Sequence, residues 1–265
     1  TSLTHHFLLW FVLVVLLPLL LITYALLQVF EKELLQTVSR QIAIVADKKT
    51  DQIDAYLDKN INDVMLKGQT ITVREAVARF SGEYARSGVN SAAYRRLDST
   101  YRAYFQRFVS GSGHYDLFLI SPQGNIVYSQ THESDFATNL FSGPYRHSGL
   151  AKVTRYALNT LEGSISEFEL YAPSGNAIAA FIAVPIMGKN KVEGVLAIQI
   201  DHSRVFQVLL DNTGMGVSGE TVVVRRESGQ EALALAPLKV DPDAALKYKI
   251  RLDNPQRAQA LARAL

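Results

Sequence analysis

The sequence predicts an α+β protein in which a long amino-terminal helix precedes antiparallel sheet. Three observations support this class. Residues 7–30 form an uncharged apolar run, apolar residues then recur at helical spacing as far as Gly68, and residues 115–200 hold a series of short strand-like runs separated by turn residues. Helical periodicity followed by clustered strands is typical of proteins that segregate helices and antiparallel sheet.

The apolar run is predicted to be a transmembrane helix. Residues 7–30 contain no charged side chain, and the run exceeds the roughly 20 residues that a bilayer-spanning helix needs. Pro18 lies mid-segment and is expected to bend the helix, while Trp10 and Tyr24 lie near the two ends, where aromatic belts occur. A cleaved signal peptide is the alternative, but its apolar core is usually shorter and a small-residue cleavage site follows it.

The helical pattern continues beyond this run without an obvious break until Gly68. Apolar residues recur mostly at steps of three or four, at Leu34, Val38, Ile42, Val45, Ile53, Tyr56, Ile61 and Val64. Two interpretations stay open, and both can hold on different faces. The helix packs lengthwise on its own domain, or its apolar seam pairs with the same helix of a second copy in a parallel dimer.

Two further helices are predicted before the strands. Thr72-Val-Arg-Glu75 matches a capping box and predicts a short helix that ends at about Phe80. A second helix is expected to start near Ser91. Its aromatic and leucine side chains fall on one stripe that is expected to be buried, namely Tyr94, Leu97, Tyr101, Tyr104, Phe105 and Phe108.

The strand-like runs begin with a predicted hairpin over residues 115–129, whose turn is Pro122-Gln-Gly-Asn125. Three more strands are predicted at Ser164–Tyr171, Ala177–Pro185 and Val192–Ile200. Two strands, a connecting loop-and-helix segment and three strands follow the order of a PAS-like antiparallel sheet.

The connection between the second and third strands is the candidate binding loop. Residues 134–145 combine acidic, amide and aromatic side chains in one long segment, and long connections of this kind often bind ligands. The alternative is a loop folded onto its own module, in which Asp135 and Asn139 cap backbone groups.

Beyond Ile200, the sequence predicts a connecting helix at His202–Leu210 and the start of a second module. Strands are predicted at Val222–Arg226 and Glu231–Pro237, and a closing helix at Gln256–Leu265. No later strands follow, so we expect the second module to be incomplete.

Composition and motifs argue against several functions. A net charge of +2 is too small to favour nucleic acid, and the absence of cysteine excludes disulfides and thiolate catalysis. Gly214-x-Gly-x-x-Gly219 has the spelling of a dinucleotide fingerprint, but a helix precedes it and a strand follows, which reverses the required context. His132, Glu133, Asp135 and His147 lack the regular spacing of a metal site. We therefore expect no catalytic residue, no metal and no cofactor in this chain.

The chain resembles the double Cache sensor domains of bacterial transmembrane receptors. The resemblance is carried by Asp116-Leu-Phe-Leu-Ile120, Asp135-Phe-Ala-Thr-Asn-Leu140, Gly143-Pro-Tyr145, Ala180-Phe-Ile-Ala-Val-Pro185 and Gly194-Val-Leu-Ala-Ile198. It implies tandem PAS-like modules, divided as a transmembrane helix at 1–30, a membrane-leading helix at 31–68, a membrane-distal module at 69–205 and the start of a membrane-proximal module at 206–265.

The resemblance also implies a function. We expect this chain to be the ligand-sensing input region of a bacterial signal-transduction receptor. The expected receptor is a sensor histidine kinase, and a diguanylate cyclase or a chemoreceptor is the alternative. It would lie in the inner membrane with its soluble part in the periplasm, form a homodimer through the long helix, and bind a small molecule of unknown class. The alternative is a membrane-anchored interaction domain whose pocket is closed by side chains.

One departure from the family pattern concerns the ligand. Members that bind α-amino acids carry an Arg-x-Trp-Tyr run, and here the single tryptophan is Trp10 in the apolar segment. Tyr171 stands at the position of the family's tyrosine, but Gln199 stands where an aspartate would hold the ammonium group. A neutral amide cannot supply that charge-assisted bond. We therefore expect common α-amino acids to bind poorly or not at all.

Candidate ligand-binding residues come from the loop and from the sheet positions that strand alternation turns toward it. They are Tyr115, Phe118, Tyr128, Asp135, Phe168, Tyr171 and Phe181.

Overall fold

The computed structural model describes residues 7, 10–189, 191–216, 219–227 and 231–251. The chain separates into two compact units, one of residues 1–50 with 212–219 and one of residues 51–211 with 220–265. The domain boundaries expected from the sequence stay predictions.

Helix α2, at Leu17–Gly68, follows a π-helical turn, η1, at Val12–Leu16. The helix ends at the glycine where the sequence pattern ends, as predicted. Its amino-terminal part is long and apolar enough to cross a membrane, and the side chains of its apolar window are not buried within the protein. The change from π to α winding lies directly before Pro18, whose nitrogen carries no hydrogen to donate.

Helices α3, at Ile71–Ser87, and α4, at Ala92–Ser112, both begin at side-chain caps. Thr70 Oγ1 accepts a hydrogen bond from Val73 N at 3.4 Å, and Ser91 Oγ accepts one from Tyr94 N at 3.0 Å. The start predicted near Ser91 is confirmed. The capping box expected at Thr72 is wrong, because the helix begins two residues earlier. It also continues past Phe80, since Glu83 still lies on its buried face.

The main sheet is antiparallel and has the order β2-β1-β6-β5-β3, with β4 also paired to β5. Its strands are β1 at His114–Ile120, β2 at Ile126–Ser129, β3 at Ser164–Ile165, β4 at Glu169–Tyr171, β5 at Ala177–Met187 and β6 at Val192–Asp201. The predicted α+β arrangement is therefore confirmed. The strand expected at Ser164–Tyr171 is interrupted, because Ser166 Oγ turns to accept a hydrogen bond from Phe181 N.

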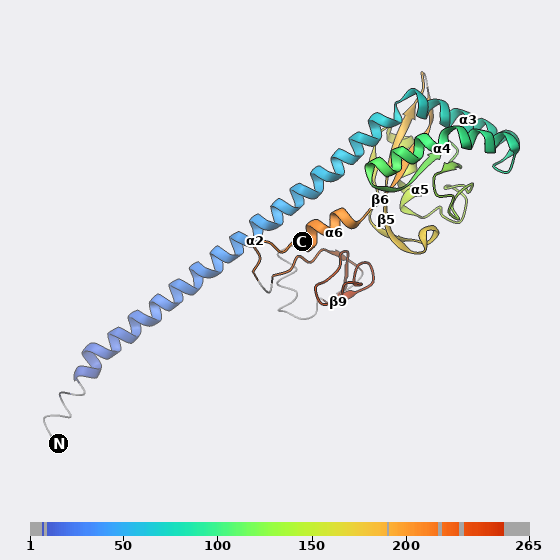
Figure 1. Ribbon diagram of the computed structural model, residues 1–265. Helices are drawn as coiled ribbons and strands as arrows, with labels where there is room; N and C mark the ends of the chain where they lie inside the picture. Colours follow the sequence, from blue (N-terminus) through green and yellow to red (C-terminus); the bar gives the residue numbers. More distant parts are fainter. Residues whose placement is uncertain (1–6, 8–9, 190, 217–218, 228–230, 252–265) are drawn as a thin grey trace. The chain divides into compact units, whose positions relative to one another are not determined.

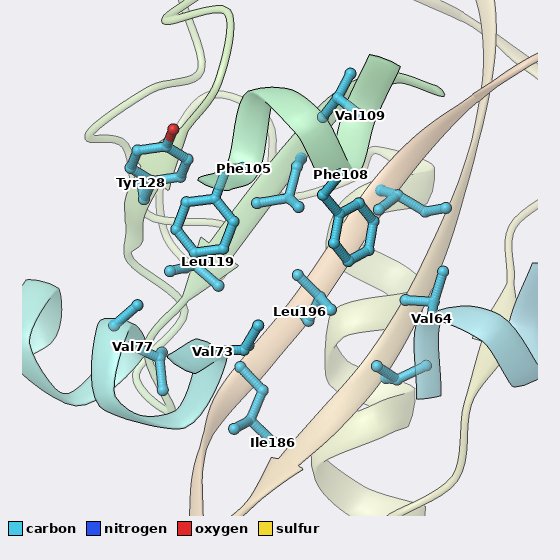
Figure 2. Packing of buried hydrophobic residues seen from close by; sticks show 14 of the residues in the cluster. Val64, Val73, Val77, Phe105, Phe108, Val109, Leu119, Tyr128, Ile186 and Leu196 are labelled. Carbon is cyan, nitrogen blue, oxygen red and sulfur yellow. The ribbon is translucent and has the colours of Figure 1, made fainter. Parts of the chain in front are cut away.

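One face of this sheet packs on helices, and we call the buried side chains there the helix-side core. Leu119 and Leu196 of the sheet meet Val73 and Val77 of α3, Phe105 of α4 and the carboxyl-terminal end of α2 (Figure 2). The aromatic stripe predicted for α4 supplies much of this core, and Figure 1 shows α3 and α4 running together beside the strands.

The opposite face of the sheet carries a second cluster, which we call the loop-side core. Alternate residues of the strands contribute to it, including Phe118 of β1, Ala197 of β6 and Phe181 of β5. Helix α5, at Gly149–Thr160, covers this face with Leu150, and Ser148 Oγ caps the helix by accepting from Ala151 N at 3.2 Å. The candidate binding loop lies on the same face, because its Leu140 is buried in this core.

A smaller antiparallel sheet follows helix α6, at Ser203–Leu210. Its order is β7-β8-β9, at Val224–Arg226, Glu231–Ala234 and Lys249–Arg251. The predicted connecting helix and the two predicted strands of the second module are present, with shorter strands than expected. The expectation that no later strand follows is wrong, because β9 pairs with β8. The helix predicted at Gln256–Leu265 lies outside the described residues.

Candidate functional site

The loop between β2 and α5 is held to the hairpin by backbone hydrogen bonds, such as that from Leu140 N to Gly124 O at 2.7 Å, and by the side chain of Asn139. Asn139 Nδ2 donates to Gln123 O and to Asn125 Oδ1, both at 2.9 Å, while its Oδ1 accepts from Phe141 N at 2.8 Å. Gly124 lies beneath the Phe141 ring at φ 84°, and a Cβ there would come within 2.6 Å of the ring. Asn139 therefore caps backbone groups, as the alternative interpretation of the loop expected.

Asp116 anchors the start of the loop from strand β1. Its carboxylate is fully buried and accepts five hydrogen bonds, from Leu117 N, Gln130 N, Thr131 N, Ser129 Oγ and Thr131 Oγ1, at distances between 2.6 and 3.1 Å. Burial raises the pKa of Asp116, and these bonds oppose that rise. Both oxygens are occupied, so this group holds structure and has no free acceptor to offer.

Asp135 lies under the loop, and only one of its two carboxylate oxygens has a hydrogen-bond partner among the described residues. Its side chain is fully buried. Tyr171 Oη donates to Oδ2 at 2.6 Å, whereas Oδ1 is buried and has no hydrogen-bond partner among the described residues. Burial is the main cause that raises the pKa of Asp135 to about 6, the charges of Asp116 and Glu133 add to the rise, and the bond from Tyr171 opposes it.

Glu133 joins the loop to two other elements. Its Oε1 accepts from Tyr115 Oη of β1 at 2.7 Å, and its Oε2 accepts from Ser174 Oγ at 2.6 Å. Ser174 ends the short 3-10 helix η2, at Ala172–Ser174, and also accepts from Gln199 Nε2 of β6 at 3.2 Å. The hydrogen bond to Glu133 raises the pKa of Tyr115 to about 12. These bonds close the rim of the loop side.

Aromatic rings occupy the space beneath the loop. The Phe181 ring lies 4.7 Å from the Tyr171 ring and 6.2 Å from the Phe118 ring, measured between centroids. Tyr145 of the loop lies 6.3 Å from Tyr171, and its Oη is 2.8 Å from Ser134 Oγ. A molecule that reached Asp135 would therefore contact these rings.

Four of the seven sequence-predicted site residues come together on the loop side, namely Phe118, Asp135, Tyr171 and Phe181. Tyr115 lies at the rim, with 47% of its surface exposed. Phe168 lies elsewhere, with its ring 6.3 Å from that of Phe206.

Tyr128 lies on the opposite face of the sheet. Its ring is 4.9 Å from that of Phe105 in the helix-side core. The cause is a β-bulge in β2: the register runs from Ile120 opposite Ile126 directly to Leu119 opposite Tyr128. The extra residue reverses the alternation that strand periodicity assumes.

A separate cavity of about 600 Å³ lies between the first two turns of α5 and the β3–β4 segment. Its lining includes Lys152, Tyr156, Glu169 and Arg225, and of the seven predicted residues it includes only Phe168. The described residues contain no group of His, Cys, Asp or Glu arranged to hold a metal ion.

Sequence reasoning missed Glu133, Ser174 and the role of Asp116 as site residues. Glu133 and Asp135 are two residues apart, and this short acidic pair was the signal available. The partners of Glu133 come from β1 and η2, which are distant in sequence. Gln199, by contrast, faces the loop side as the resemblance implied.

No family model and no curated protein matches the chain. Among solved structures, the sensor domain of the histidine kinase DctB of V. cholerae aligns with a TM-score of 0.58 and 16% identity, over 86% of this chain and 76% of that one. The ligand-binding domain of the Pseudomonas fluorescens chemoreceptor CtaA, in complex with L-serine, aligns with a TM-score of 0.47 and 12% identity, over 76% and 71%. The Pseudomonas aeruginosa PAO1 amino acid chemoreceptor PctC, in complex with GABA, gives 0.43 and 13%, over 75% and 74%.

The likeness to the kinase sensor domain covers most of each chain. The element order described above is a long helix, a PAS-like antiparallel sheet and a smaller second sheet. The chain therefore has the Cache-type sensor-domain fold.

Proposed function

We propose that this chain is the ligand-sensing input region of a bacterial transmembrane receptor, and that its ligand binds between the loop and the sheet. The observation that carries the proposal is Asp135 Oδ1. A buried carboxylate oxygen without a partner costs free energy. Such costs persist where function requires them, and ligand-binding loops are a common location.

The proposed site consists of Asp135 and the rings around it, Phe118, Tyr171 and Phe181. Tyr115 belongs to its rim through the hydrogen bond to Glu133. Tyr128 and Phe168 fall outside it, because the first packs in the helix-side core and the second against Phe206.

Helix α2 is the proposed route of the signal. It runs from the apolar segment to Gly68 as one helix, and its last turns pack in the helix-side core through Val64. We place the apolar segment in the inner membrane and the sheets in the periplasm. A histidine kinase is the proposed output, and a diguanylate cyclase or a chemoreceptor signalling region are the alternatives.

A second candidate function is a membrane-anchored interaction domain with a closed pocket. The packing of Phe118, Tyr171 and Phe181 beneath the loop favours it, since these side chains are almost completely buried. The two candidates differ in one measurable property, because only a sensor is stabilised by a small molecule.

The test is thermal unfolding of the full chain in lipid nanodiscs with a library of amines, amino acids, dicarboxylates and sugars. We expect at least one compound to stabilise the protein. At a hundredfold excess over Kd, the gain in free energy of unfolding is about 2.7 kcal/mol. Phe181→Leu should weaken the response, and Phe206→Leu, outside the site, should leave the affinity unchanged. Equal responses in both variants would place the ligand elsewhere, and a library without effect would favour the interaction domain.

Dimerisation through α2 gives an independent prediction. Val38 and Ile42 lie on its apolar seam with 44% and 49% of their surfaces exposed, whereas Gln36 and Arg40 lie off the seam. The chain has no cysteine, so single substitutions are clean probes. In membranes, Val38→Cys and Ile42→Cys should cross-link between two copies in high yield, and Gln36→Cys and Arg40→Cys in low yield. Equal yields at all four positions would refute the paired helix.

A further inference from the structure

The loop side gathers three carboxylates, and Arg155, a cation that reaches the loop, donates to the carbonyl oxygens of Leu140 and Phe141 instead of to them. Asp116, Glu133 and Asp135 lie close enough that the first two charges act on the third. Among the described residues, the ion pairs involve none of these three carboxylates. Buried or partly buried charges are normally paired or bound to a metal, so this cluster is incomplete as it stands.

The donors that do reach the cluster are neutral. Asp116 is saturated by backbone N–H groups and by the hydroxyls of Ser129 and Thr131. Both oxygens of Glu133 accept from hydroxyls, and so does Oδ2 of Asp135. Asp135 Oδ1 is the one carboxylate oxygen among the buried unpartnered atoms of the described residues. The cluster thus has one free hydrogen-bond acceptor, Asp135 Oδ1, next to carboxylates that form no ion pair.

The charge and the free oxygen of Asp135 together decide which ligand group would bind there. A water molecule or a hydroxyl could make the hydrogen bond but would leave the charge unbalanced. A ligand carboxylate would be repelled by all three residues. An ammonium group supplies both a donor and a positive charge.

We propose that the loop side binds a protonated primary amine that lacks an α-carboxylate, with its ammonium group on Asp135 Oδ1. This inference rests on the proposed function and specifies its ligand class. No Lys or Arg of the described residues forms an ion pair with Asp116, Glu133 or Asp135. A carboxylate next to the bound ammonium group would therefore meet three negative charges, which disfavours α-amino acids. Gln199, neutral and bonded to Ser174, contributes no charge of either sign.

The test measures binding of stated probes to the full chain in nanodiscs by calorimetry at pH 8. Ethanolamine, putrescine and 2-phenylethylamine are the amines. 1,4-Butanediol is the neutral match for putrescine, and glycine, L-alanine and succinate carry carboxylates. We expect at least one amine to bind and its neutral or carboxylate counterpart to bind at least tenfold more weakly.

Two variants connect the binding to the cluster. Asp135→Asn keeps an oxygen for Tyr171 but removes the charge, and it should weaken amine binding at least tenfold. Glu133→Gln removes one charge at the rim and should weaken it severalfold, which gives a second measurement if the first variant folds poorly. Glu75→Gln, at an exposed ion pair with Arg79 on α3, is the matched control and should change nothing.

The outcomes distinguish failure of the amine inference from failure of the proposed sensor function. Binding of succinate or of the diol, unaffected by Asp135→Asn, would overturn the amine inference and leave the proposed function standing. Failure of the complete library of the unfolding test would overturn both. An amine that binds the wild type and both variants equally would also overturn the inference, because its ammonium group would then lie elsewhere.

Amine affinity should also depend on pH, because the ammonium group requires ionised Asp135. The pKa of Asp135 is raised to about 6 by burial and by Asp116 and Glu133, against the hydrogen bond from Tyr171. Primary amines stay protonated well above that pH. Affinity should therefore rise as pH is raised through about 6 and level off above it. Below that range it should fall by about tenfold per pH unit, and a flat profile between pH 5 and 8 would contradict the assignment.

Discussion

Asp135→Asn is expected to stabilise the unliganded protein at pH 8 by about 3 kcal/mol and to have little effect below pH 4. The pKa of Asp135 is raised from an ordinary value of 3.8 to about 6 in the folded protein, first by burial. A raised carboxyl pKa contributes stability that is complete below the unfolded value and is lost as pH rises through the folded value. Wild-type stability should therefore fall between pH 4 and pH 7, and the variant lacks that loss.

The measurement is urea unfolding of both proteins between pH 3.5 and pH 8. Asp116 is also buried with a raised pKa, and the effect of its own burial is common to both proteins. Glu75→Gln serves as the control, because its ion pair with Arg79 has both side chains more than half exposed and such pairs contribute about 0–1 kcal/mol. If the wild type and Asp135→Asn lose stability in parallel, Asp135 does not titrate as described and the charge cluster loses its support.

Gly194→Ala is the second large effect, an expected loss of about 3 kcal/mol in free energy of unfolding. A Cβ at Gly194 would lie 2.5 Å from the carbonyl oxygen of Ile120 and 2.6 Å from Val77 Cγ2. Gly194 belongs to β6, which is paired on both sides by β1 and β5. The backbone oxygen therefore cannot move without breaking the pairing of two strands, and the α3 side chain lies against the same point.

Gly82→Ala is the matched control for this substitution. It lies inside α3 with nothing within 4 Å of the added Cβ, so the higher helix propensity of alanine should stabilise the protein by up to about 1 kcal/mol. Thermal and urea unfolding of the two variants should shift in opposite directions. A neutral Gly194→Ala would show that β6 and α3 pack more loosely than the contacts indicate.

Much of the fold follows from sequence periodicity. The helix ending at Gly68, the strands β5 and β6 and the connecting helix α6 were all predictable, because each is a long segment with one consistent period. The start of helix α3 was less predictable, because two nearby residues could cap it. Thr70 and Thr72 can both cap a helix, and in the structure Thr70 is the residue whose side chain accepts from Val73 N.

Site residues could be predicted where their role follows from their position in the loop sequence. They could not be predicted where their role depends on which residues pair across the sheet. Asp135 and Tyr171 were both identified, but the bond between them joins residues 36 positions apart. Tyr128 was assigned to the wrong side of the sheet, since a one-residue bulge leaves no mark in a hydrophobic pattern. Glu133 gains its role only from Tyr115 and Ser174, which no spacing rule connects to it.

The bulge in β2 has a mechanical consequence for the sheet. It places Val127 and Tyr128 together in the helix-side core, where Tyr128 packs against Phe105, and it turns Ser129 to the other face, where Ser129 Oγ donates to Asp116. One planar peptide unit therefore joins a side chain of the helix-side core to the hydrogen-bond network that anchors the start of the loop.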